Sequence, residues 1–575
     1  MKNSGLISMK NLAVITGFGG LSAAGRSGGN HAFRRIVYDA LNAEQQASTR
    51  QSLATLMGLS PEQEEEILAG TLVRGWDNVS FDPEAAPFHK PFQDADGNEC
   101  YRVTSRRLSV QSGAQLPRGF DPATEYRSRH HPRGLQMAIY AASDALGSLG
   151  IEWETLRQHL APDEIGVYAG SLMGQLDQQG HGGMTQASLL GKRVSSKQCP
   201  LGMTGMPADF VNAYVLGNLG STGSMAGACA TFLYNLRLGL DDIESGRRRL
   251  VMVGNSEAPL TPEIIDGYAA MTALVTETRL RDLDGIDPDQ VPDFRRASRP
   301  FGDNAGFTLA ESAQFFVLTD DTLALELGLN ILGSVGSVFV NGDGYKKSIS
   351  NPGVGNYLTM GKAMASARRL LGDDALKQRS YVHAHGSSTP QNRTTESHIY
   401  QELAGAFGIK NWPVTAIKAH LGHSLAAASA DQVMAALGTW GDNILPGITT
   451  THAIADDVCR QGVDYKLKHE TIAPGQLDIA FINSKGFGGN NASGTLLSPQ
   501  VTCQLMAEKH GQAELDKHQD LNTAIQENAQ QYNDEMNSGT RKPRYLFGQD
   551  VLEPADLEVT DTHISVKGWD KPVSL

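Results

Sequence analysis

Short apolar segments alternate with amphipathic helical segments along most of this chain. Residues 165–170 and 250–254 are apolar runs of strand length that end in glycine, and residues 230–245 between them place apolar side chains at helical spacing. Residues 381–385 and 479–482 repeat the strand pattern in the second half. Strands that alternate with helices in this way favour an α/β fold with buried, largely parallel sheets.

Composition and charge limit the classes of protein to which the chain can belong. Of the 575 residues, 40% are hydrophobic, enough for a large core, and the net charge of −14 argues against a general nucleic-acid binder. The first residues lead into no long apolar segment, and no run reaches the roughly 18 apolar residues of a membrane span. We therefore expect a cytoplasmic protein with no membrane span and no nucleic-acid partner.

The cysteines are five, an odd number, and they are widely spaced. This arrangement matches neither a disulfide framework nor the closely spaced ligands of a zinc site, so we expect a reducing compartment and no metal. One cysteine differs from the others in its surroundings, because Cys229 lies in a Gly-Ala-Cys-Ala-Thr segment just before a predicted helix. For the remaining four we favour a structural role: Cys100, Cys199, Cys459 and Cys503.

Three further motifs follow Cys229 in a fixed order. His385 lies in Ala-His-Gly-Ser-Ser-Thr-Pro, and Lys418 and His423 begin and end Lys-Ala-His-Leu-Gly-His. A glycine-rich segment at residues 483–491 closes the series. A cysteine nucleophile with two histidines and no metal indicates carbon–carbon bond formation on thioesters, in which the thiolate carries the acyl group.

These motifs, in this order, resemble those of the β-ketoacyl synthases, the condensing enzymes of fatty-acid and polyketide assembly within the thiolase superfamily. The resemblance extends over residues 14–493. It implies an α/β, thiolase-like fold that is duplicated and stacked as five αβαβα layers. We expect a first half at residues 1–250 with an insertion at about 28–130, a second half at 251–500, and a C-terminal extension at 501–575.

The resemblance also assigns roles to particular side chains. It implies that Cys229 accepts the acyl group and that His385 and His423 stabilise the enolate formed from a malonyl group. It further implies that Lys418 pairs with Glu396 to fix the two histidines. The helix that follows Cys229 is expected to lower the pKa of the thiol.

The glycine-rich segment is expected to complete the site. By resemblance, the backbone N–H groups of Cys229 and Lys485 form an oxyanion hole. Many family members carry a gating phenylalanine where this chain has Lys485, and an acidic residue is common where it has Arg393. The candidates for the substrate pocket are Met173, Thr389 and Phe487.

The function implied is a decarboxylating Claisen condensation of an acyl thioester with a malonyl carrier protein, without a cofactor. Residues 17–27, the insertion and the extension resemble a FabY-type bacterial branch, which implies acetyl-CoA as the primer and fatty-acid synthesis as the pathway. One alternative is an elongating or specialised-pathway synthase that uses longer acyl carrier primers. Another is a catalytically silent partner subunit, but such subunits lose the cysteine that this chain keeps. A non-decarboxylating thiolase would need a second cysteine in a late glycine-rich motif.

The expected partners are acyl carrier protein, acyl-CoA and a second copy of the chain in a homodimer. Because carrier proteins are acidic, docking needs local basic surface, for which residues 247–249 and the arginines between 127 and 133 are candidates. For the insertion, we favour a surface cap or a dimer contact over a lid that selects the substrate.

Overall fold

The computed structural model describes residues 10–60, 89–93, 96–97, 99–103, 108–188 and 191–575. Its centre is a 12-stranded sheet assembled from two sets of strands, which meet where β1 pairs with β9. The first set runs in the order β6 (Thr222–Gly223), β5 (Ile165–Gly170), β7 (Leu250–Glu257), β8 (Ser312–Asp320) and β1 (Ala13–Ser22). The second runs in the order β11 (Trp412–Thr415), β10 (Ser380–His383), β15 (Ile479–Gly486), β16 (Asn490–Leu497) and β9 (Gly333–Asn341), with β13 (Val463–Tyr465) outside β11.

The two sets share one pairing pattern. In each set, in the order given above, the first three strands are parallel to one another. The fourth strand is antiparallel to the third, and the fifth is antiparallel to the fourth. This correspondence supports the predicted duplication. It also makes the sheet mixed, where the sequence pattern predicted largely parallel pairing. The pairing divides the chain between β8 and β9, later than the boundary at residue 250 that we expected from the sequence.

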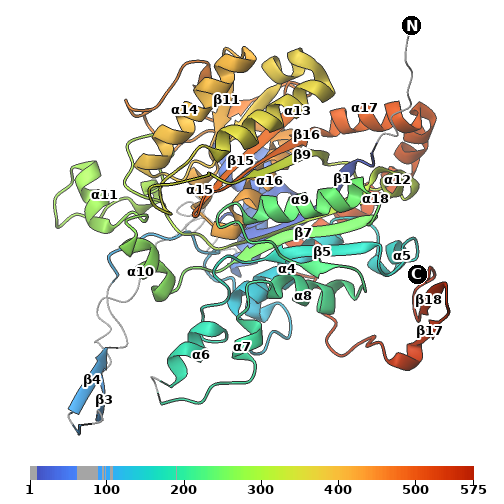
Figure 1. Ribbon diagram of the computed structural model, residues 1–575, viewed down its shortest axis with the longest axis horizontal. Coiled ribbons are helices and arrows are strands. Elements are labelled where there is room, and N and C mark those ends of the chain that lie inside the picture. Colours follow the sequence, from blue (N-terminus) through green and yellow to red (C-terminus); the bar gives the residue numbers. More distant parts are fainter. Residues whose placement is uncertain (1–9, 61–88, 94–95, 98, 104–107, 189–190) are drawn as a thin grey trace.

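Helices form three layers around the two sets of strands (Figure 1). Between the sets lie α9 (Thr231–Glu244) and α16 (Ala428–Asp442), whose apolar side chains pack with residues from both sets in one core. The outer face of the first set is covered by α4 (Arg133–Gly147) and α8 (Met206–Val211), and that of the second by α13 (Gly355–Gln378) and α14 (Pro390–Phe407). The predicted five-layer α/β architecture is confirmed.

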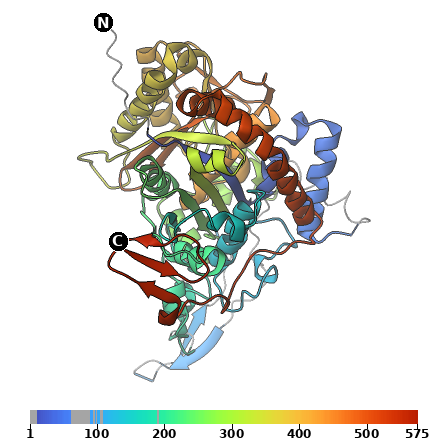
Figure 2. The ribbon, with the colours of Figure 1, turned by 90° about the vertical axis from the view of Figure 1, so that its right-hand side faces the viewer.

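The segments outside the two halves add helices and strands around them, although α1 (His31–Ile36) is buried in the central core. The insertion contributes α1, α2 (Ala43–Met57) and a hairpin of β3 (His89–Gln93) and β4 (Glu99–Val103) that projects from the body (Figure 1). In the extension, α17 (Pro499–His510) leads into α18 (Gln512–Asn537), which crosses one face beside α2 (Figure 2). A small sheet of β17 (Leu557–Val559), β18 (His563–Val566) and β19 (Val573–Ser574) follows.

A buried ion pair joins the extension to the core. The Arg26 guanidinium lies 2.7 Å from the Asp144 carboxylate of α4 and 2.7 Å from the side-chain oxygen of Asn533 on α18. Both members of the pair are almost wholly buried, so each charge depends on the other for compensation. In the part of the chain described here, no helix is both long and apolar enough to cross a membrane.

Candidate active site

Cys229 lies in a tight turn immediately before α9. Ala228 has a φ of +50°, a backbone conformation that few residues other than glycine adopt. The Thr231 hydroxyl stabilises this turn, since it accepts a hydrogen bond from the Gly227 N–H at 3.0 Å and donates one to the Ala228 carbonyl at 2.6 Å. The turn places the Cys229 thiol against the inner end of a cavity of about 1080 Å³.

The environment of the thiol favours its protonated form. Burial raises the pKa of Cys229 to about 11, and the charge of Glu257 acts in the same direction. The Lys418 ammonium and the N–H groups of Phe487 and Cys229 oppose this effect without reversing it. The expectation that the start of α9 lowers the thiol pKa below its usual value was therefore wrong for the free protein, because desolvation is the larger effect.

The raised pKa predicts how Cys229 responds to pH. Since the thiolate is the reactive form and is scarce below the pKa, its alkylation by iodoacetamide is expected to accelerate about tenfold per pH unit between pH 7 and 10. Peptide mapping of the alkylated protein would measure this rate, with the exposed Cys199 as an internal check on the reagent. A rate at Cys229 that levels off below pH 8 would contradict the buried, protonated thiol.

His385 and His423 face the same cavity as Cys229. His385 follows β10, and its Nδ1 accepts a hydrogen bond from the Lys485 N–H at 3.3 Å. His423 follows α15 (Lys418–Leu421), and its Nδ1 accepts from the Leu425 N–H at 3.2 Å. A ring whose Nδ1 accepts a hydrogen bond must carry its proton on Nε2 when neutral. Each histidine therefore offers an Nε2–H donor.

The two imidazoles are neutral hydrogen-bond donors. Their ring centroids are 5.4 Å apart and the planes cross at 81°. Burial lowers the pKa of both His385 and His423 well below 6.5, and the nearby positive charge of Lys418 lowers them further. Two convergent N–H groups in a buried cavity can stabilise an oxygen that acquires negative charge, such as that of an enolate.

Lys418 and Glu396 both bind the backbone of the His385 segment. The Lys418 ammonium donates to the His385 carbonyl at 2.7 Å. The Glu396 carboxylate accepts from the N–H groups of His385 at 2.7 Å and of Gly386 at 2.9 Å. Among the ion pairs of the described residues, none joins the two side chains directly, but the charge of Glu396 acts on Lys418 and opposes the effect of burial on its pKa. The two side chains hold His385 together, and burial lowers the pKa of Lys418 to about 8.

Three further side chains satisfy the buried Glu396 carboxylate. It accepts hydrogen bonds from Asn392 at 2.8 Å, from the Tyr400 hydroxyl at 2.6 Å and from Asn483 at 2.9 Å. With the two N–H groups, the carboxylate accepts hydrogen bonds from five donors. The sequence motifs pointed to Glu396 but gave no sign that Tyr400 would reach it.

Three backbone N–H groups lie at the predicted oxyanion hole. The Lys485 N–H is engaged with His385, and the N–H groups that contact the Cys229 sulfur are those of Cys229 itself and Phe487. The glycine-rich segment approaches closely because Gly486 has no side chain; a Cβ there would lie 2.4 Å from the Gly227 carbonyl oxygen. In the free protein the Phe487 N–H, and not that of Lys485, contacts the sulfur, and the role of Lys485 in the oxyanion hole stays a prediction.

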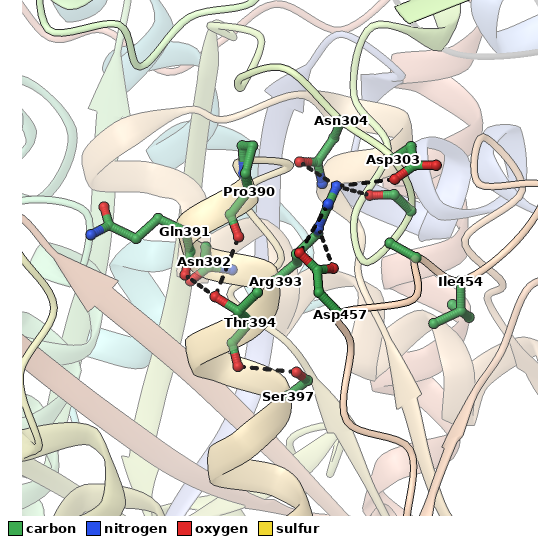
Figure 3. A network of polar contacts seen from close by, with 12 residues as sticks. Asp303, Asn304, Pro390, Gln391, Asn392, Arg393, Thr394, Ser397, Ile454 and Asp457 are labelled. Atoms are coloured by element: carbon green, nitrogen blue, oxygen red, sulfur yellow. Dashed lines mark hydrogen bonds and ion pairs between the residues drawn. The ribbon is translucent and has the colours of Figure 1, made fainter.

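Arg393 fixes the start of the helix that carries Glu396 (Figure 3). Its guanidinium binds both oxygens of Asp457, at 2.8 and 3.0 Å, and donates to the Gly302 carbonyl at 2.9 Å. Asp303 lies 3.5 Å from the same group. A cation at this unusual position thus holds the first turns of α14 against two neighbouring loops.

The predicted pocket residues separate into two groups. Thr389 and Phe487 line the cavity together with Lys485. Met173 does not line it and packs in an apolar cluster with Cys229 and Phe487, which also includes Tyr268 of α10 (Pro262–Ala270) and two residues of the insertion, Leu108 and Val110. The end of the insertion therefore reaches the site, contrary to the expectation of a surface cap.

Sequence reasoning missed Glu257, the buried carboxyl at the end of β7. It accepts hydrogen bonds from the N–H groups of Leu172 at 2.7 Å and Met173 at 3.2 Å. Burial raises its pKa to about 7. A carboxyl placed directly after an apolar strand was a signal that could have identified it.

Comparisons with known proteins agree with this geometry. The protein-family model of the beta-ketoacyl synthase N-terminal domain matches residues 57–324, and the family model of the C-terminal domain matches residues 332–451. The beta-ketoacyl-[acyl-carrier-protein] synthase FabY of Pseudomonas aeruginosa is 47% identical over 98% of both chains. A crystal structure of the ketosynthase FabY from P. aeruginosa has a TM-score of 0.94 and 45% identity, covering 100% of this chain and 98% of that one. A 3-oxoacyl-[acyl-carrier-protein] synthase 2 of Vibrio harveyi is 30% identical over 66% of this chain and 86% of its own. The chain therefore belongs to the β-ketoacyl synthase family and is an acyltransferase.

Proposed function

We propose that this protein condenses an acetyl group, taken from acetyl-CoA, with a malonyl group carried by acyl carrier protein, and so starts fatty-acid synthesis. The observation that carries the proposal is the convergence of one thiol, two neutral Nε2–H donors and two backbone N–H donors on one buried cavity. The similarity to the FabY synthase, whose name specifies an acyl carrier protein substrate, supports the choice of carrier.

In the first half of the reaction, Cys229 accepts the acyl group. Its sulfur, once ionised, attacks the thioester carbonyl, and the resulting oxyanion is held by the N–H groups of Cys229 and Phe487. The carbon–sulfur bond of the primer then breaks, and the CoA thiolate leaves with the electron pair and takes up a proton in place of the one that Cys229 lost. The acyl group remains on the cysteine as a thioester.

In the second half, the malonyl thioester replaces CoA. Its carbonyl oxygen binds the Nε2–H groups of His385 and His423, which stabilise the enolate as the bond to the carboxylate breaks and CO₂ departs. The electron pair of that bond gives the carbon nucleophile, which attacks the acyl carbonyl on Cys229. The cysteine sulfur leaves, and a β-ketoacyl thioester two carbons longer is released.

The space behind Cys229 favours a short primer. The Tyr268 hydroxyl points to the Met173 sulfur at 3.8 Å, and both side chains pack with Leu108 and Val110 behind the nucleophile. The cavity that contains Cys229 is not lined by any of these four residues. An acetyl group needs no room beyond the sulfur, whereas an alkyl chain that extends from Cys229 toward this cluster would have to displace it.

Met173→Ala is expected to admit longer primers. Removing the side chain leaves space next to Tyr268, so the preference for acetyl over hexanoyl groups should fall by about tenfold or more. Acetyl-CoA and hexanoyl-CoA would compete for Cys229, and mass spectrometry would count each acyl-enzyme. Met360→Ala, which shortens a buried methionine in another core cluster, controls for general loosening. An unchanged preference in Met173→Ala would argue against this cluster as the limit on primer length.

A direct assay tests the proposed reaction. Purified protein would be incubated with malonyl carrier protein and either acetyl-CoA or medium-chain acyl carrier proteins, and the products followed by mass. A four-carbon ketoacyl product from acetyl-CoA would support initiation. Product only from longer primers would favour an elongating synthase, and no product from any primer would favour a silent partner subunit.

The arginine triplet, one candidate surface for the acidic carrier protein, is partly engaged in ion pairs. Arg247 is paired with Asp242 at 2.7 Å, and Arg249 with Asp320 at 2.9 Å. In the second candidate cluster, Arg133 is paired with the buried Glu311 at 2.5 Å. The exposed Arg127 and Arg129 remain as candidates from the sequence.

A homodimer formed at β6 is also proposed. This short strand lies at one end of the sheet, and a strand at a sheet edge offers backbone groups to a second chain. Apolar side chains flank it, with Leu219 49% and Met225 46% exposed. Met225→Lys is expected to shift the protein toward the monomer in light scattering, whereas Leu370→Lys, at a residue 47% exposed on α13, should leave the mass unchanged. Equal masses for the two variants would exclude β6 as the contact.

A further inference from the structure

Lys485 places a positive charge inside the substrate cavity. Its side chain lines the cavity that contains Cys229 and His385, at a position where an aromatic residue was expected from the family resemblance. The ammonium donates one hydrogen bond, to the Thr395 hydroxyl of α14 at 2.8 Å. Within the described parts of the chain, it takes part in no ion pair. An ammonium has three donors, so two are available to a molecule that enters the cavity.

The two acidic side chains whose charges act on Lys485 already bind other groups. The charges of Glu396 and Asp343 act on Lys485, but the Glu396 carboxylate already accepts five hydrogen bonds. Asp343 lies 3.2 Å from the Lys346 ammonium and accepts further hydrogen bonds from Gly355 and Asn491. Lys485 is partly buried, and a cation withdrawn from solvent without a dedicated anion is costly, which makes an anionic ligand its natural complement.

The backbone of Lys485 connects this charge to the reacting centre. The N–H of the same residue donates to Nδ1 of His385, whose Nε2–H is one of the two proposed enolate donors. The position of the ammonium is therefore coupled to that of the imidazole through a single residue. By contrast, the Lys418 ammonium donates to a backbone carbonyl and does not line the cavity.

We propose that the Lys485 ammonium binds the free carboxylate of the malonyl donor and so selects a carboxylated thioester for the second half of the reaction. This inference rests on the proposed condensation. In a malonyl thioester the carboxylate is separated by one carbon from the carbonyl that the histidines bind. One malonyl group can therefore contact the Lys485 ammonium and the two histidines at the same time. When the carbon–carbon bond breaks, its electron pair enters the enolate and neutral CO₂ leaves, which ends the ion pair.

The kinetic consequence is specific. This ion pair is present in the bound malonyl thioester and is lost on decarboxylation. It therefore contributes more to binding of the malonyl thioester than to the chemical step. Lys485→Met keeps the length of the side chain and removes its charge. It is expected to raise KM for malonyl carrier protein by about 10- to 100-fold, the value of a charge-assisted hydrogen bond, while kcat changes less.

The test compares two malonyl thioesters in the unaltered protein and in its lysine variants. Acetylation of Cys229 by acetyl-CoA, which involves no donor carboxylate, would measure the fraction of each preparation with an intact site. The condensation assay would then use malonyl carrier protein and malonyl N-acetylcysteamine thioester, which lacks the phosphate of the carrier arm. A similar rise in KM for both donors supports carboxylate binding. A rise confined to the carrier protein would mean that Lys485 binds phosphate, and would overturn the proposal.

Lys346→Met is the matched control, because it removes the second lysine of the cavity lining, whose charge is already paired with Asp343. We expect a clearly smaller rise in KM than for Lys485→Met. Equal effects would indicate a general loss of positive charge and would contradict a specific subsite. If the unaltered protein is acetylated but forms no product from either malonyl donor, the proposed function fails, independently of Lys485.

Discussion

Replacing Cys229 with alanine is expected to abolish condensation, lowering its rate on the order of 10⁴-fold or more, because no other group at the site can carry the acyl chain. The remaining parts of the site should survive the change. The Cys229 carbonyl still accepts the Ser484 hydroxyl at 2.9 Å, and the two histidines are held by backbone N–H groups that the substitution does not touch. We therefore expect the alanine variant to decarboxylate the malonyl donor while it forms no ketoacyl product.

The measurement separates the two halves of the reaction. Mass spectrometry of the carrier protein would distinguish the malonyl, acetyl and ketoacyl forms in one sample. Thermal unfolding would show that the variant is folded, and Cys459→Ala, at a partly buried cysteine remote from the cavity, controls for the loss of a thiol. Ketoacyl product formed at a measurable rate by Cys229→Ala would exclude this residue as the nucleophile.

The sequence was most informative where chemistry is carried by contiguous motifs. The identity and order of Cys229, His385 and His423 predicted three groups that the fold brings to one cavity. The alternation of strands and helices likewise predicted the α/β class. These inferences succeeded because each depends on residues that are close together in the chain.

The details that depend on three-dimensional packing were harder to predict. Strand β15 ends at Gly486, between Lys485, whose N–H donates to His385, and Phe487, whose N–H contacts the thiol, so the local turn of the backbone decides which N–H meets which group. The thiol pKa reflects burial by distant segments, including Leu108 from the insertion. The spacing between Glu396 and Lys418 could not show that the two side chains bind opposite groups of the His385 backbone.

The second large effect concerns the two histidines. His385→Ala and His423→Ala are each expected to lower condensation by about 10²- to 10³-fold, because each removes one donor to the enolate oxygen. Acetylation of Cys229 should continue, since the N–H groups of Cys229 and Phe487 serve that step. His420→Ala removes a buried histidine of α15 that does not line the cavity, and it should cost condensation much less.

The pH dependence of decarboxylation also tests whether His385 and His423 act as neutral hydrogen-bond donors. The pKa values of His385 and His423 are held well below 6.5 by burial and by Lys418, so both rings stay neutral as the pH rises through 6.5. Protonation would place a hydrogen on Nδ1, where the N–H groups of Lys485 and Leu425 already point. Decarboxylation by Cys229→Ala, which removes the thiol from the pH profile, should therefore show no transition from the histidines; the groups that titrate near the site above pH 6 are Glu257, with a pKa of about 7, and Lys418, with a pKa of about 8. A midpoint near 6.5 that persists when Glu257→Gln is added would mean that the histidines act by exchanging protons, and not as fixed neutral donors.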